Sequence, residues 1–130
     1  MTSGQRTIPD GPNEGTSRYR DRIGELGEAA ASLDALLRVL VSNCEQVCRD
    51  LDDGLSAVDS VRGIGDEAGR GFRRDVHAAT TRFEQAMQAS RGESLRLLVR
   101  EGGIPVAQLS RLTGISAQMI RRLMRTAEDS

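Results

Sequence analysis

The sequence predicts an all-α protein: a long amphipathic helix paired with a second helix, followed by a small tri-helical module. Three observations support this prediction. Apolar residues recur at alternating spacings of three and four across residues 23–61, which is a heptad pattern. Only 2% of the 130 residues are aromatic, which favours a core of Leu, Val and Ala packed between helices. A helix–glycine–helix pattern occupies residues 106–125.

The first segment, residues 1–17, is rich in Gly, Pro, Ser, Thr and Asn and has little to bury. This composition is typical of a segment that buries too little apolar surface to offset the entropic cost of becoming ordered. We therefore expect a disordered N-terminal tail.

The heptad pattern begins after Arg18 and predicts one long helix to about residue 62, with Gly54 as its one poor position. Positions flanking the pattern are apolar as well, including Leu36 and Val41, so the apolar face is too wide for one neighbouring helix. We expect a dimer seam along the a and d positions, formed by Ile23, Leu26, Leu33, Leu37, Leu40, Cys44, Val47 and Leu51.

A second helix is predicted after the glycine-rich residues 63–71, where Gly63 suits a helix end and Asp66 a helix start. We favour an antiparallel hairpin of residues 18–62 and 67–90. The alternative is one near-continuous helix with a glycine kink, in a long parallel coiled coil. Because the second helix is shorter, part of the first stays uncovered, so residues 18–90 should form a homodimer or a higher helical bundle.

Charge is distributed unevenly along the chain. Residues 1–90 carry 11 Arg and 15 acidic residues, whereas residues 91–130 carry 7 Arg and 4 acidic residues. Between Val106 and Arg125 there are four Arg and no acid. A polyanionic partner is therefore expected at the C-terminal segment.

Residues 91–126 predict three short helices, followed by a tail at 127–130. Ser90 to Glu93 has the pattern of a capping box that restarts a helix. Gly102 and Gly103 end that helix, and Pro105 precedes the next one. Gly114 then supplies the corner and Ser116 the cap of a last helix, whose inward residues are Ile120, Leu123 and Met124.

The stretch VAQLSRLTGISAQMIRRLMR resembles the helix-turn-helix of lac-repressor-type and resolvase-type DNA-binding domains, although Ser110 stands where those families usually have Ala. The resemblance implies that the last helix enters the major groove of double-stranded DNA. It places Ala117, Gln118 and Arg122 at base edges, where Gln suits adenine and Arg suits guanine. It places Ser116, Arg121, Arg125 and Arg111 at phosphates.

Other chemistry is poorly supported. Cys44 and Cys48 share a helix face and lie at apolar positions, where Cys acts as a small hydrophobe, although a metal or redox role stays open. His77 stands alone, and no nucleophile–base set or phosphate loop is present. We expect no enzymatic activity, cofactor or metal. No run of about 18 apolar residues predicts a membrane span, so we expect a cytoplasmic, nucleoid-associated protein.

The resulting hypothesis is a sequence-specific DNA-binding protein of bacterial type, a dimeric transcriptional regulator. The alternative is a helical interaction or assembly protein with structural C-terminal helices and a protein partner. The hairpin resembles the small secreted WXG-type helical hairpins, but the Trp of that motif is absent.

Overall fold

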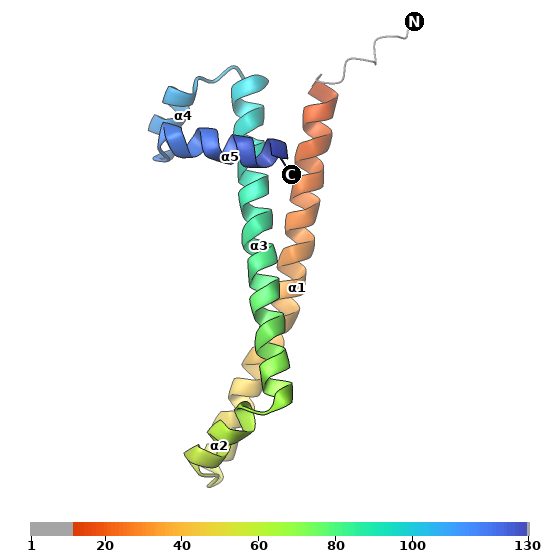
Figure 1. Ribbon diagram of the computed structural model, residues 1–130, viewed down its shortest axis with the longest axis vertical. Coiled ribbons are helices and arrows are strands. Elements are labelled where there is room, and N and C mark those ends of the chain that lie inside the picture. Colours follow the sequence, from red (N-terminus) through yellow and green to blue (C-terminus); the bar gives the residue numbers. More distant parts are fainter. Residues whose placement is uncertain (1–11, 130) are drawn as a thin grey trace, which may run out of the picture. The chain divides into compact units, whose positions relative to one another are not determined.

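The computed structural model describes residues 12–129, which form five helices and contain no strand (Figure 1). The helices are α1 (Pro12–Asp52), α2 (Ala57–Ile64), α3 (Glu67–Arg100), α4 (Val106–Thr113) and α5 (Ala117–Asp129). The all-α prediction is confirmed. None of the described helices is long and apolar enough to cross a membrane.

The chain divides into two compact units. The terminal unit comprises the chain up to Gly27 and again from Gln85, and the central unit comprises Glu28–Glu84. Helices α1 and α3 each contribute to both. Within the central unit the chain folds back on itself, since the Arg82 guanidinium donates a hydrogen bond of 3.3 Å to the Ser32 hydroxyl, 50 residues earlier. The fold-back agrees with the hairpin and not with one kinked continuous helix.

Helix α1 begins earlier than the predicted tail allows. Residues 12–17 are helical, whereas the remainder of the predicted tail, residues 1–11, lies outside the described residues. Pro12 suits the first position of a helix, because an N–H at that position would have no acceptor inside the helix and proline has none. Gly15 is buried, and a Cβ on it would overlap the Glu101 carboxylate and lie 3.1 Å from Leu97 Cδ2. Gly15, which resembled part of a tail, instead allows close packing against Leu97 of α3.

The first helix also ends earlier than predicted, at Asp52 and not near residue 62. Gly54 has φ +105°. Its N–H donates to Leu51 O at 3.1 Å, and the N–H of Leu55 donates to Asp50 O at 2.9 Å. This pair of hydrogen bonds is a Schellman motif with Gly54 in the left-handed position that L-residues avoid. Gly54 is therefore a helix terminator and not a weak seam residue.

The next two helix starts are set by side-chain caps. Ser56 Oγ accepts from Asp59 N at 3.1 Å and begins α2. Asp66 Oδ1 accepts from Gly69 N at 2.8 Å and begins α3, as predicted. Each cap satisfies an N–H that has no partner inside its own helix.

Helix α3 then runs without a break through residues 90–93, so the predicted capping box and the domain boundary at 90/91 are wrong. Ser90 and Glu93 are both buried inside the helix. The Glu93 carboxylate pairs with Arg18 of α1 and with Arg96 of α3 itself. These two ion pairs take the place of the expected hydrogen bond to a helix N-terminus. Residues 91–126 therefore do not stand as a separate folded segment.

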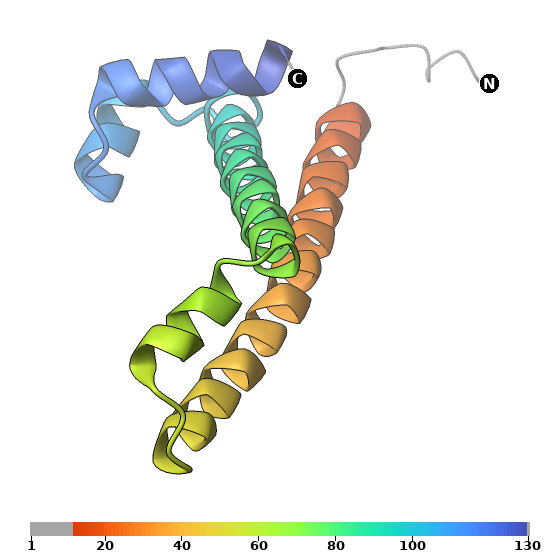
Figure 2. The same ribbon diagram turned by 60° about the horizontal axis from the view of Figure 1, so that its bottom comes forward.

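The central unit buries little. Ala29 is its one fully buried hydrophobic residue among the described side chains. Of the predicted seam, Leu33 and Val47 are half-buried here, whereas Leu37, Leu40, Cys44 and Leu51 are exposed. Helix α2, which lies near the end of α1 in Figure 2, has no buried residue. Within the single chain, the predicted seam is therefore only partly covered.

Candidate nucleic-acid interface

The corner between α4 and α5 is built as the sequence predicted. Gly114 has φ +77°, and its N–H donates to Ser110 O at 3.0 Å. A Cβ on Gly114 would meet no atom within 4 Å, so the backbone conformation and not crowding demands glycine. Thr113 Oγ1 accepts from Ile115 N at 3.1 Å, and Ser116 Oγ accepts from Met119 N at 3.1 Å. Side chains thus satisfy the amides exposed by the turn.

The apolar core of the terminal unit holds the two short helices on the last turns of α3. Leu95 from α3, Leu109 from α4, and Ile120 and Leu123 from α5 form this core. Partly buried residues surround it, among them Val106, Ile115 and Met124. The inward residues predicted for the last helix are therefore buried or half-buried. Ile120 is fully covered, which makes it the centre of the packing.

The opposite face of α5 is polar and exposed. Gln118, Arg121, Arg122 and Arg125 are all exposed, and they lie on the side of the helix away from Ile120 and Leu123. Ser116 and, on α4, Arg111 are exposed too, whereas Ala117 is half-buried. The structure thus gathers most of the predicted contact residues on one accessible surface, and Ala117 is the least accessible of them.

The arginines of this surface lack acidic neighbours. Within residues 12–129, no ion pair involves Arg111, Arg121, Arg122 or Arg125. Arg122 Nη2 lies 3.3 Å from Met119 Sδ, a neutral acceptor. By contrast, Arg18, Arg96 and Arg100 of the same unit all pair with carboxylates. Among the described residues, no carboxylate therefore neutralises the positive charge on α5.

Gly92 fixes where α5 crosses α3, and sequence reasoning missed it. The residue is buried, and a Cβ there would overlap the Leu123 carbonyl and lie 3.0 Å from Ala127 Cβ. Ala127 is itself buried, and α5 continues to Asp129. The predicted tail at 127–130 is thus wrong for residues 127–129, and Ser130 lies outside the described residues. The small residues Gly92 and Ala127 were the one sign in the sequence that two helices could cross closely here.

A charged network ties the last turns of α5 to α1 and α3. Glu93 is 1% exposed, with Oε2 3.0 Å from Arg96 Nη1 and 3.6 Å from Arg18 Nε. Glu128 accepts from Arg100 at 2.6 Å and lies 3.4 Å from Arg96 Nε. A cation near the last carbonyls of a helix also favours its dipole, and Arg22 donates to Ala127 O at 3.4 Å. No pattern in the sequence predicted these ion pairs.

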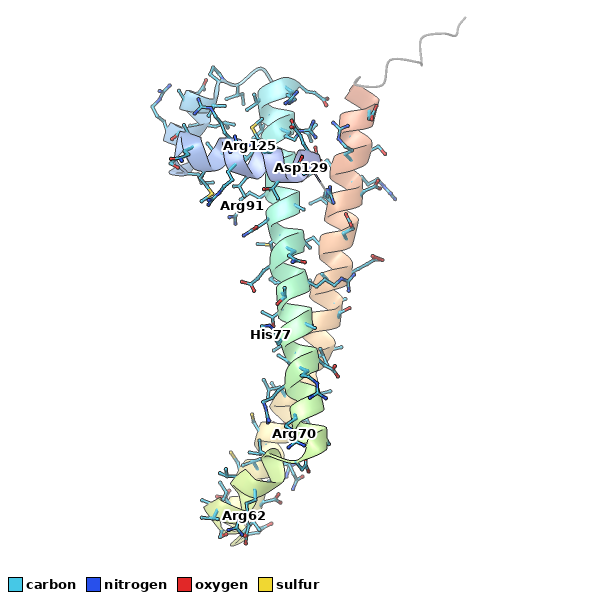
Figure 3. The ribbon with its side chains drawn as sticks, viewed as in Figure 1. Arg62, Arg70, His77, Arg91, Arg125 and Asp129 are labelled. Carbon is cyan, nitrogen blue, oxygen red and sulfur yellow. The ribbon has the colours of Figure 1, made fainter. Side chains whose placement is uncertain are left out.

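Arg91 enlarges the basic surface. It is exposed, it precedes the Gly92 contact with α5, and Figure 3 shows it on α3 beside the α5 crossing that carries Arg125. No ion pair to Arg91 occurs within residues 12–129. His77, also labelled in Figure 3, is exposed on α3 in the central unit. Within the described part of the chain, no cluster of His, Cys, Asp and Glu has the makeup of a metal site.

Comparisons of the chain with protein-family models, with curated proteins and with solved structures found no match.

Proposed function

We propose that the protein binds double-stranded DNA through the exposed face of α5. The observation that carries this proposal is a set of exposed arginines that form no ion pair within residues 12–129: Arg121, Arg122 and Arg125, on the same face as Gln118. DNA phosphates would supply negative charge to these arginines. The counterions that the phosphates release make such binding strongly dependent on salt.

The resemblance to helix-turn-helix domains gives the residues their proposed roles. Gln118 and Arg122 lie one turn apart and read base edges, with Ala117 against a thymine methyl group. Ser116, Arg121, Arg125 and Arg111 hold phosphates and set the register. A transcriptional regulator on the nucleoid, acting as a homodimer on a two-fold site with half-sites about 34 Å apart or a multiple of that distance, is the function we propose for this arrangement.

The experiment compares arginine variants with the wild type by fluorescence anisotropy with duplex DNA across a range of salt concentrations. Arg122→Ala should cost about 1–3 kcal/mol on the preferred sequence and relax its selectivity. Arg125→Ala should weaken binding to every sequence and reduce the salt slope by about one. The preferred sequence is first selected from a random duplex library.

Arg74→Ala is the matched control, because Arg74 is an exposed arginine of α3 in the central unit and its loss changes the net charge equally. It should leave binding unchanged. Equal DNA retention by the wild type and by a triple Ala variant of Arg121, Arg122 and Arg125 would reject the proposal.

A second candidate function, a helical interaction protein, is favoured by a different observation. The central unit exposes Leu37, Leu40, Val41, Leu51, Leu55, Val58, Val61 and Ile64. Exposed apolar surface on this scale marks a site of association. Under this alternative, the arginines of α5 are solvent-exposed surface residues that bind no ligand. The protein then shows no salt-dependent retention of DNA.

A further inference from the structure

Helix α1 carries a row of exposed apolar residues in the central unit. Leu37, Val41 and Leu51 are 42%, 58% and 40% exposed, and Cys44 and Cys48 between them are exposed as well. We call these five residues the free row. Their spacing of four, three, four and three residues is the spacing of a coiled-coil seam.

The free row differs from the face of α1 that is covered inside the central unit. The covered side is marked by Ala29, which is buried, and by the half-buried Leu33, Leu36 and Val47. At 3.6 residues per turn, the two faces are centred roughly 80° apart around the helix. Within residues 12–129, one side of the wide apolar face therefore has a partner and the other side is exposed.

Two features limit the free row to about two heptads. Upstream, the next position of the same spacing is Asp34, an exposed carboxylate that pairs with Arg38 at 2.9 Å. Downstream, the helix terminates at the left-handed Gly54. Helix α2 of the same unit adds apolar surface through Val58, Val61 and Ile64, and Leu55 in the turn before α2 is exposed as well. Since an isolated helix of eight residues is unstable in water, α2 also benefits from a covering surface.

We propose that a second copy of this chain covers the free row, with the two α1 helices antiparallel about a two-fold axis near Cys44. The occupant follows from charge. Arg38, Glu45 and Asp52 follow one another at intervals of seven residues and so lie along one flank of the row. In an antiparallel dimer, this flank of one α1 faces the same flank of the second α1, which runs in the opposite direction. Arg38 then faces Asp52 of the second copy, and the symmetric contact repeats at the other end.

A parallel copy fits less well, because the charged flank would then face the other flank of the row. That flank consists of Leu33, Leu40 and Val47 and lies toward the covered face. Arg38 and Asp52 would gain no partner there. In the antiparallel arrangement, Glu45 faces Glu45 of the second copy, which is the one repulsive contact of this flank. The two contacts between Arg38 and Asp52 are attractive. The proposal stands on this surface alone and does not depend on DNA binding.

The first test is sedimentation equilibrium of the full chain without DNA across micromolar concentrations. Val41→Asp places a charge in the free row and should raise the dimer dissociation constant at least tenfold. Val39→Asp is the matched control, because Val39 is an exposed valine on the opposite side of α1. It should leave the dissociation constant unchanged. A monomeric wild type, or equal weakening by both variants, would overturn the proposal.

The second test examines the direction of the two helices. Arg38→Asp and Asp52→Arg should each weaken the dimer severalfold, and the double variant should recover the wild-type dissociation constant. Recovery would come from restored opposite charges at both ends. Circular dichroism checks that the helical content is unchanged. Additive weakening in the double variant would contradict the antiparallel contact.

The third test uses the native thiols. Cys44 lies at the midpoint of the free row and faces its own copy, so the Cys48→Ser variant should form a disulfide-linked dimer rapidly with diamide. Two thiols lose two protons and two electrons, which reduce diamide to its hydrazine. The Cys44→Ser variant should cross-link several times more slowly. The reverse order of rates would shift the axis away from Cys44 and overturn the assignment.

Discussion

The terminal and central units use the same two long helices but stabilise them differently. The terminal unit has a common core of four buried residues, Leu95, Leu109, Ile120 and Leu123, and Ala127 is buried as well. In the central unit only Ala29 among the described hydrophobic side chains reaches that degree of burial, while several Leu, Val and Ile side chains stay exposed. Apolar periodicity alone therefore does not tell which stretch of a helix forms a core within its own chain.

The two units also differ in charge. The described residues of the terminal unit contain 10 Arg and 7 acidic residues, whereas the central unit contains 7 Arg and 11 acidic residues. Three arginines of the terminal unit are used internally against Glu93 and Glu128. Most of the remaining arginines lie on α4, on α5 or, as Arg91, on α3 beside α5. A polyanion is thus attracted to one unit and repelled by the other.

The largest effect that would sharpen this contrast comes from removing a leucine side chain in each unit. Leu109→Ala deletes a side chain that is 2% exposed and should lower the free energy of unfolding by about 2–5 kcal/mol. Leu55→Ala deletes one that is 42% exposed and lies outside the free row, so it should cost less than about 1 kcal/mol. Urea denaturation measures both. Equal losses would refute the assignment of the core to the terminal unit.

The next effect concerns carboxylates. Glu93→Gln removes the buried negative charge between Arg18 and Arg96, and it should lower the free energy of unfolding by about 1.5–3 kcal/mol. Asp34→Asn removes an exposed partner of Arg38 in the central unit and should cost about 0–1 kcal/mol. Both values come from chemical denaturation at neutral pH. A Glu93→Gln variant as stable as the Asp34→Asn variant would mean that the network contributes little.

The smallest effect is expected at two glycines. Gly114→Ala forces a left-handed backbone on a residue with a Cβ and should cost about 1–2 kcal/mol. Gly63→Ala, inside α2, meets no atom within 4 Å and should stabilise the protein by about 0.5–1 kcal/mol. Thermal unfolding should therefore shift in opposite directions for the two variants. A shift in the same direction would contradict one of the two backbone assignments.

Local signals in the sequence predicted the local structure well. The corner at Gly114, the cap at Ser116 and the helix start at Asp66 each depend on residues within four positions of one another. The inward face of α5 followed from periodicity, because Ile120 and Leu123 recur at helical spacing. These features require no knowledge of distant partners. The roles of Gln118 and the arginines toward DNA stay predictions.

The errors arose where a distant partner or a competing local motif decides the structure. Gly92 and Glu93 resembled part of a capping box, but contacts with α5 and α1 keep them inside α3. Residues 12–17 resembled a tail because Leu97, which packs against the buried Gly15, lies far along the chain on α3. Gly54 is the case of a competing local motif, because the glycine together with Ser56 and Asp59 indicates the end of one helix and the start of the next.

The charged network that joins α1 to α5 has a consequence for the order of synthesis. Arg22 and its acceptor Ala127 are 105 residues apart. At roughly 5–20 residues per second, a ribosome makes the second roughly 5–20 s after the first. The first turns of α1 therefore leave the ribosome well before α5 exists to receive them. The terminal unit becomes complete only when a late segment returns to an early one, whereas all of the central unit has already been translated by then.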